Sequence, residues 1–241
     1  MAAEESKLTQ PYLYMDSYDI TIAWACIAIQ TSIYLYITGQ HTIGQHTTGQ
    51  FTRKQRAWTL SMIASSVYLC VSPFIIYDFF ADVKNGTLNL AISNERYIDR
   101  TLIIWLIANF ILDIVIGYMH YSEYQDFYIC HVHHTYYLIL MNYALDANLT
   151  RTFVILLPLE IPNFFRAIGT IWPNLRNDIV FGSTFFMTRI VYEIVAAYYL
   201  YYTTDFPKLV LIICTMLTLP IHSLWFYKWC LMYAKGPKSL N

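Results

Sequence analysis

Long blocks of apolar residues, separated by short polar stretches, are the feature that most constrains this chain. A helix needs roughly 20 residues to cross the hydrocarbon core of a bilayer. Blocks of about that length occur at residues 20–38, 57–80, 101–120, 127–146, 152–172, 180–203 and 207–233. Inside a bilayer the backbone must satisfy its own hydrogen bonds, which helices do. The sequence therefore predicts an all-α, polytopic transmembrane helical bundle with about seven transmembrane helices.

The composition supports an embedded chain with little soluble surface. Hydrophobic residues make up 57% of the 241 residues and charged residues 13%, whereas a soluble domain carries roughly 25% charged residues. The net charge of −1 provides no field that would recruit nucleic acid. We expect membrane lipids as partners, and the oligomeric state is left open. The predicted transmembrane domain covers residues 20–233, between a polar N-terminal tail at 1–19 and a C-terminal tail at 234–241.

The five cysteines all fall within or at the ends of apolar blocks. Their odd number and their spacing indicate neither a disulfide framework nor a CxxC metal site. We expect buried thiols at Cys26, Cys70, Cys130, Cys214 and Cys230.

Several ionisable residues interrupt the apolar blocks. Such a side chain at the middle of a bilayer costs about 2.5 to 3.5 kcal/mol, so it usually faces the interior of the bundle. In block 101–120, the spacing of Asn109, Asp113 and His120 places all three near one face of a helix. In block 152–172, Glu160 and Asn163 lie beside prolines that loosen the helix.

Arg189 and Glu193 are four residues apart in block 180–203. An i,i+4 ion pair within one helix would neutralise both charges. We expect this pairing, with a carboxylate on a neighbouring helix as the alternative partner of Arg189.

Three histidines, His131, His133 and His134, stand near the start of block 127–146. Imidazole can move protons near neutral pH, and a carboxylate partner would fix its tautomer. Asp113 and Glu160 are the available partners. A purely structural role for the histidines is the alternative.

A His-x-His-His cluster also resembles the histidine boxes of membrane di-iron enzymes. Those sites need about eight histidines, whereas this chain has seven, several of them isolated. We therefore expect no metal ion and no bound cofactor, and keep a single metal ion as the less favoured alternative.

The polar residues, taken in order, resemble those of the TLC-domain family, and most closely its small single-domain members. The segments that carry the likeness are residues 109–113, 133–134, 159–163, 184–190 and 224–228. The family includes the ceramide synthases, in which two adjacent histidines form the catalytic centre for acyl transfer from acyl-CoA. Where ceramide synthases carry paired aspartates in the following helix, this chain offers one carboxylate, Glu160.

The resemblance implies a lipid-metabolism protein of the endoplasmic reticulum membrane. The leading hypothesis is an acyltransferase that uses acyl-CoA as co-substrate and a lipid amine or hydroxyl as acceptor. Its expected catalytic residues are His133, His134, Asp113 and Glu160. Its expected substrate-binding residues are Asn109, His131, Asn163 and Arg189. The competing hypothesis is a non-catalytic protein that binds lipids or regulates membrane composition.

Basic residues predict an orientation in the membrane. Positive charge is enriched on the cytosolic side, which places Arg53, Lys54 and Arg56 in the cytosol. The glycosylation sequons at Asn85 and Asn148 then lie on the lumenal side.

Overall fold

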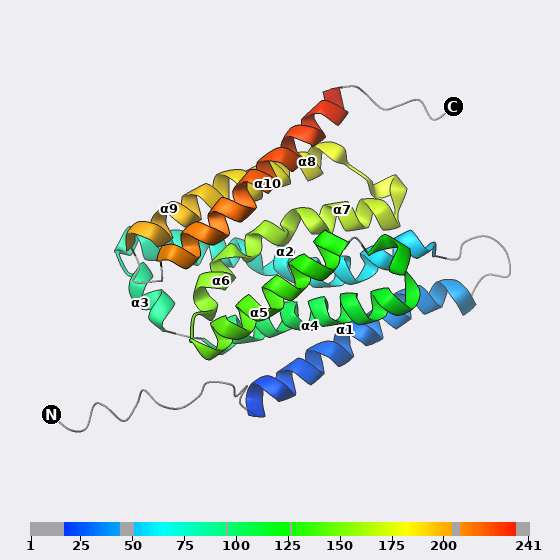
Figure 1. Ribbon diagram of the computed structural model, residues 1–241, viewed down its shortest axis with the longest axis horizontal. Helices are drawn as coiled ribbons and strands as arrows, with labels where there is room; N and C mark the ends of the chain where they lie inside the picture. Colours follow the sequence, from blue (N-terminus) through cyan, green and yellow to red (C-terminus); the bar gives the residue numbers. More distant parts are fainter. Residues whose placement is uncertain (1–16, 44–50, 95, 126, 204–207, 235–241) are drawn as a thin grey trace.

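The computed structural model describes residues 17–43, 51–94, 96–125, 127–203 and 208–234, which form a bundle of helices running between two ends (Figure 1). The main helices are α1 (Ser17–Ile43), α2 (Arg53–Asn85), α3 (Leu88–Ser93), α4 (Tyr97–His120), α5 (His133–Asp146), α6 (Thr150–Leu156), α7 (Ile161–Ile171), α8 (Asp178–Phe186), α9 (Glu193–Thr203) and α10 (Lys208–Ala234). These residue ranges contain no strand, which confirms the all-α prediction.

Short turns of other helix types interrupt or join the main helices. Three are 3₁₀ turns: η2 (Ser122–Tyr124), η4 (Leu157–Glu160) and η5 (Pro173–Leu175). Two are π-helical: η3 (Phe127–Val132), which leads into α5, and η6 (Met187–Tyr192), which joins α8 to α9. The described residues of each expected apolar block are helical apart from Trp172, and α3, η2 and η5 lie outside the blocks.

Five helical segments of the described chain are long and apolar enough to cross a membrane: Ser17–Gly39, Arg53–Asn85, Tyr97–His120, Thr150–Ile171 and Asp178–Thr203. The surface of the bundle is correspondingly apolar, with Trp24 68% exposed and Phe74 72% exposed. A water-soluble monomer rarely exposes large contiguous apolar patches. This is the pattern of an integral membrane protein, and the expected count of about seven crossings stays a prediction.

Helix α4 lies inside the bundle and carries Asn109 and Asp113. It packs against α1, α2, α5 and α6. Ile103 and Ile104 are fully buried in this packing. The Gln30 side chain of α1 donates a 2.9 Å hydrogen bond to the Trp105 carbonyl of α4. Because α4 is enclosed in this way, its polar residues Asn109 and Asp113 face other helices rather than lipid.

One end of the bundle, which we call the Arg53 end, gathers the start of α2, the end of α4 and the end of α7. Gln55 Nε2 donates a 2.7 Å hydrogen bond to the Ile171 carbonyl, and Arg53 lies 3.2 Å from Glu123. The π turn η3 also begins at this end (Figure 1). His131, His133 and His134, which lie in η3 and at the start of α5, are therefore nearer the Arg53 end than the opposite end.

The opposite end, the Asp99 end, is held by a buried arginine. Arg151, at the start of α6, is 2% exposed. Its guanidinium lies 3.6 Å from Asp99, 3.7 Å from Asp78 and 3.7 Å from Asp82. Three helices thus converge on one cation. Buried charges need such partners, since an unpaired one is costly.

All five cysteines are thiols in the structure. Cys26 and Cys130 are buried as expected, and Cys214 and Cys230 are half-buried. The expectation is wrong for Cys70, which is exposed on α2. An apolar block in a membrane protein buries only the side that faces other helices, so its hydrophobicity does not place every residue inside.

Candidate functional site

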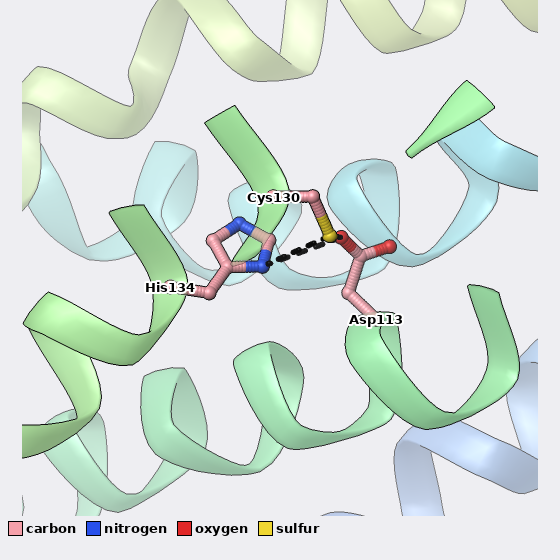
Figure 2. Close-up of side chains that lie close together, drawn as sticks. All are labelled: Asp113, Cys130 and His134. Carbon is pink, nitrogen blue, oxygen red and sulfur yellow. Dashed lines mark hydrogen bonds and ion pairs between the residues drawn. The ribbon is translucent and has the colours of Figure 1, made fainter. Parts of the chain in front are cut away.

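Asp113, Cys130 and His134 bring three different polar atoms together, and we call them the Asp113 group. Figure 2 shows the three side chains converging from α4, from η3 and from α5. His134 Nδ1 lies 3.5 Å from Asp113 Oδ2 and 3.8 Å from Cys130 Sγ. Cys130 Sγ lies 3.7 Å from the same carboxylate oxygen. Of the two carboxylates named as possible partners of the histidine cluster, Asp113 lies beside it, and His134 is the histidine that it meets.

Two further side chains fix the carboxylate of Asp113. Tyr121 donates a 2.8 Å hydrogen bond to Oδ1, which leaves Oδ2 facing Cys130 and His134. Burial, and then the neighbouring Asp113 carboxylate, raises the pKa of Tyr121 far above its ordinary value, so the phenol keeps its proton. Gln125 donates to the Asp113 carbonyl at 2.8 Å and to Cys130 Sγ at 3.4 Å. These contacts hold the chain that follows α4 against the group.

His133 and His134 have different surroundings although they are adjacent in sequence. The His134 ring stacks on Phe110, with ring centroids 4.6 Å apart. His133 is an exposed residue, and its ring centroid lies 4.6 Å from that of Tyr137. Within the described part of the chain, the His133 ring has no hydrogen-bond partner. His134 is therefore held by its neighbours, whereas the nitrogens of His133 are available to a ligand.

A second set of polar residues, the Glu160 group, joins Glu160, Asn163 and Arg189. Asn163 Nδ2 donates a 2.5 Å hydrogen bond to Glu160 Oε2. Arg189 Nη2 donates to Asn163 Oδ1 at 3.1 Å and lies 3.8 Å from Glu160 Oε1. The helix is interrupted at η4, as the neighbouring prolines predict, and the Leu159 carbonyl there accepts a 2.7 Å hydrogen bond from Arg189 Nε.

The expected i,i+4 pair between Arg189 and Glu193 is wrong. Glu193 accepts from His222 of α10, with 2.8 Å between Oε2 and Nδ1, and also from Thr218. The π turn η6 ends at Tyr192, directly before Glu193. The spacing of four still leaves the two side chains near one face, but each charge is bound by a partner on another segment of the bundle. The alternative, a carboxylate on another segment, is correct: it is Glu160.

His133 stands within electrostatic reach of both polar sets. Its ring centroid is 5.7 Å from that of His134. The charges that act on it come from Glu160, Arg189 and His222. His133 therefore lies next to the Asp113 group and close enough to Glu160 and Arg189 for their charges to act on it.

Two expected substrate-binding residues lie outside both groups. Asn109 is 7% exposed, and its Oδ1 atom has no hydrogen-bond partner in the part of the chain that the structure describes. His131 is half-buried with its ring 6.1 Å from Phe127. His120, expected on the face of Asp113, is exposed at the end of α4 with its ring 6.5 Å from Tyr34.

Sequence reasoning missed Cys130, Tyr121 and Gln125. Cys130 had a signal, because its spacing of four from His134 is that of neighbours on a helix. Tyr121 and Gln125 follow the end of α4, and the sequence does not show that the chain there folds back on Asp113. No protein-family model, curated protein or solved structure matches this chain. The residues themselves must therefore carry the functional argument.

Proposed function

We propose that the chain is a TLC-like protein of the endoplasmic reticulum membrane with about seven crossings. Two further segments supply the added crossings: η3 with α5, over residues 127–146, and α10, which has 27 residues. The first segment is as long as the roughly 20 residues that a bilayer core requires, and the second is longer. Both present apolar side chains outward, such as Ile139 at 68% exposure and Met216 at 70%.

We further propose that the protein transfers a fatty acyl chain from acyl-CoA to a lipid amine or hydroxyl. The acceptor attacks the thioester carbonyl and passes its proton to His133. The CoA thiolate leaves and takes a proton back from the imidazolium. A positioned imidazole is suited to this work because its protonation changes near neutral pH.

One observation carries the proposal: within the described residues the exposed His133 has no hydrogen-bond partner for its ring, while Nδ1 of the adjacent His134 lies 3.5 Å from Asp113. A histidine that takes a proton from the substrate needs a ring nitrogen without another hydrogen-bond partner. The residue beside it can then serve to hold it in position. His134 and Asp113 accordingly act as positioning residues for His133. The expected role of Glu160 becomes that of binding the acceptor headgroup, together with Asn163 and Arg189.

The charges at the Arg53 end support acyl-CoA as the donor. Arg53, Lys54 and Arg56 stand there, at the start of α2. Positive charge favours the cytosolic side, where the soluble donor is available, and His133 lies nearer this end. The phosphates of CoA would meet basic residues on the approach.

The experiment uses the purified full chain in lipid nanodiscs with acyl-CoA and a mixture of lipid amines and alcohols. Wild type should release CoA and form an acylated lipid. The His133→Ala variant should lower the rate by about a hundredfold or more, the scale of a positioned acid or base. His120→Ala is the matched control, since His120 is exposed and outside both groups, and it should retain the rate. No release of CoA by well-folded wild type with any acceptor would reject the proposal.

A non-catalytic lipid-binding function is the second candidate. It is favoured by an apolar groove of about 270 Å³ between α9 and α10, lined by residues that include Ile194, Tyr198 and Met216. Neither polar group contributes to this groove. Under this candidate, wild type would bind lipid without consuming acyl-CoA, and His133→Ala would bind it equally well.

A further inference from the structure

Outside the proposed acyl transfer, we infer that Asp113, Cys130 and His134 form a binding site for a divalent transition metal ion, with Zn²⁺ as the best fit. The three side chains offer sulfur, nitrogen and oxygen to one point, with all their ligand atoms within 4.8 Å of one another. Zn²⁺ is bound in proteins by these three kinds of atom.

The separations between the atoms match those of a tetrahedral zinc site. Zinc lies about 2.3 Å from sulfur and about 2.0 to 2.2 Å from nitrogen or oxygen, so tetrahedral angles place the ligand atoms about 3.4 to 3.6 Å apart. The separations here are 3.5 Å for Nδ1 to Oδ2, 3.7 Å for Sγ to Oδ2 and 3.8 Å for Sγ to Nδ1. A contraction of a few tenths of an ångström would complete the three corners.

The geometry differs from that of a Cys-His-Asp nucleophile. A catalytic base needs its two ring nitrogens turned to different partners, one to the nucleophile and one to the carboxylate. Here Asp113 and Cys130 both lie beside Nδ1 of His134. Convergence of the sulfur and the carboxylate on a single nitrogen suits a shared cation.

Neighbouring groups orient two of the three ligands, as they do in known metal sites. Tyr121 holds Oδ1 of Asp113 and turns Oδ2 toward the group. Gln125 donates to Cys130 Sγ at 3.4 Å and holds the sulfur beside the carboxylate. On binding, the thiol releases one proton to solvent, and thiolate plus carboxylate neutralise the two charges of the ion. A neutral site is the form least costly to bury in a membrane protein.

Three protein ligands leave a fourth position for water or a substrate atom. The site also joins the end of α4 to the start of α5. A bound ion would therefore hold His134 in place and fix the backbone of the adjacent His133.

The test uses purified full-length protein and Co²⁺ or Zn²⁺ alone as the probe. Co²⁺ should give the near-ultraviolet charge-transfer band of a cobalt–thiolate bond, and Zn²⁺ should remove that band by competition. Cys130→Ser should abolish the band, while Cys70→Ser, which changes an exposed thiol outside the group, should retain it. His134→Ala and Asp113→Asn should weaken Co²⁺ binding by at least about tenfold.

A second measurement needs no spectrum and no activity. Zn²⁺ should raise the Tm of wild type and leave that of Cys130→Ser unchanged, because an ion that binds only the folded state stabilises it. A wild-type protein that shows neither the band nor the Tm shift would overturn the inference, as would a band that survives Cys130→Ser. Neither readout depends on acyl transfer, so the two proposals can fail separately.

Discussion

Arg189 and Glu193 lie four residues apart in one helical segment, yet each is bound to a different neighbour. Arg189 contacts Asn163 and the Leu159 carbonyl, and Glu193 contacts His222. Both side chains are buried. The two charges are therefore stabilised by separate contacts that tie the segment from α8 to α9 to different helices.

Substitution of Arg189 by Leu should destabilise the protein strongly. It leaves Glu160 and the Leu159 carbonyl without their cationic partner, and breaking a buried pair typically costs about 3 to 5 kcal/mol. The Tm in detergent should fall well below that of wild type. Adding Glu193→Leu should not restore the Tm.

A second double variant, Glu193→Leu with His222→Leu, tests the other pair. It should be more stable than the sum of its two single changes implies, because those two residues are partners. Recovery with the first pair and not the second would contradict the structure.

Substitution of Arg151 by Met should have a comparable effect at the Asp99 end. Asp99 and Asp78 would keep Arg96 as their other contact, and Asp82 would lose its cationic partner. We expect a loss of about 3 to 5 kcal/mol, measured as unfolding in detergent. Arg176→Met is the matched control, since the Arg176 pair with Asp178 is exposed and such pairs contribute about 0 to 1 kcal/mol.

Substitution of Gly117 by Ala tests the packing around the Asp113 group. A Cβ atom at Gly117 would lie 2.0 Å from Gln125 Nε2, so the Gln125 side chain must move. Its hydrogen bonds to the Asp113 carbonyl and to Cys130 would be lost, at a cost of about 1 to 3 kcal/mol.

The matched control for this change is Gly39→Ala, because a Cβ there meets nothing within 4 Å. It should be neutral, or stabilising by about 0.5 to 1 kcal/mol. Thermal unfolding of the two variants gives the comparison. Equal stability of Gly117→Ala and wild type would show that Gln125 is not held as described.

The orientation in the membrane can be measured by labelling introduced cysteines. Lys54→Cys should react with a membrane-impermeant maleimide from the cytosolic side, since Lys54 lies at the Arg53 end. Asn85→Cys, at the opposite end of α2, should react only after the lumen is opened. Wild type supplies the background from the native thiols. The reverse pattern would place the Arg53 end in the lumen.

The helices could be predicted from the sequence because the requirement to cross a bilayer imposes a length on each apolar block. Expected block 127–146 coincides with η3 and α5. The contacts between blocks were less predictable. A carboxylate, Asp113 or Glu160, was expected beside the histidine cluster because few partners exist inside a membrane, but the sequence did not show that Asp113 would meet His134. Arg151 and its three aspartates lie toward helix ends, where charged residues are common and do not indicate a particular contact.

The expected pairing of Arg189 was wrong because the sequence does not show which segments pack against residues 187–193. Arg189 donates to the Leu159 carbonyl and to Asn163, and Glu193 accepts from His222. The π turn at residues 187–192 has no signal in the sequence either. Short α3 was missed for another reason, since six residues are too few to display a period.

The π turn at Phe127–Val132 leads directly into the helix that carries His133 and His134. Its hydrogen bonds span five residues instead of four, so the turn widens and accommodates one residue more than an α-helical turn does. Deleting one residue there would allow an α-helical turn to form in its place and leave His133 and His134 close to their present direction. The same deletion within α5 would rotate all the following residues by about 100°. The chain can therefore change its length by one residue at this turn with less effect on the histidines than at a regular helical position.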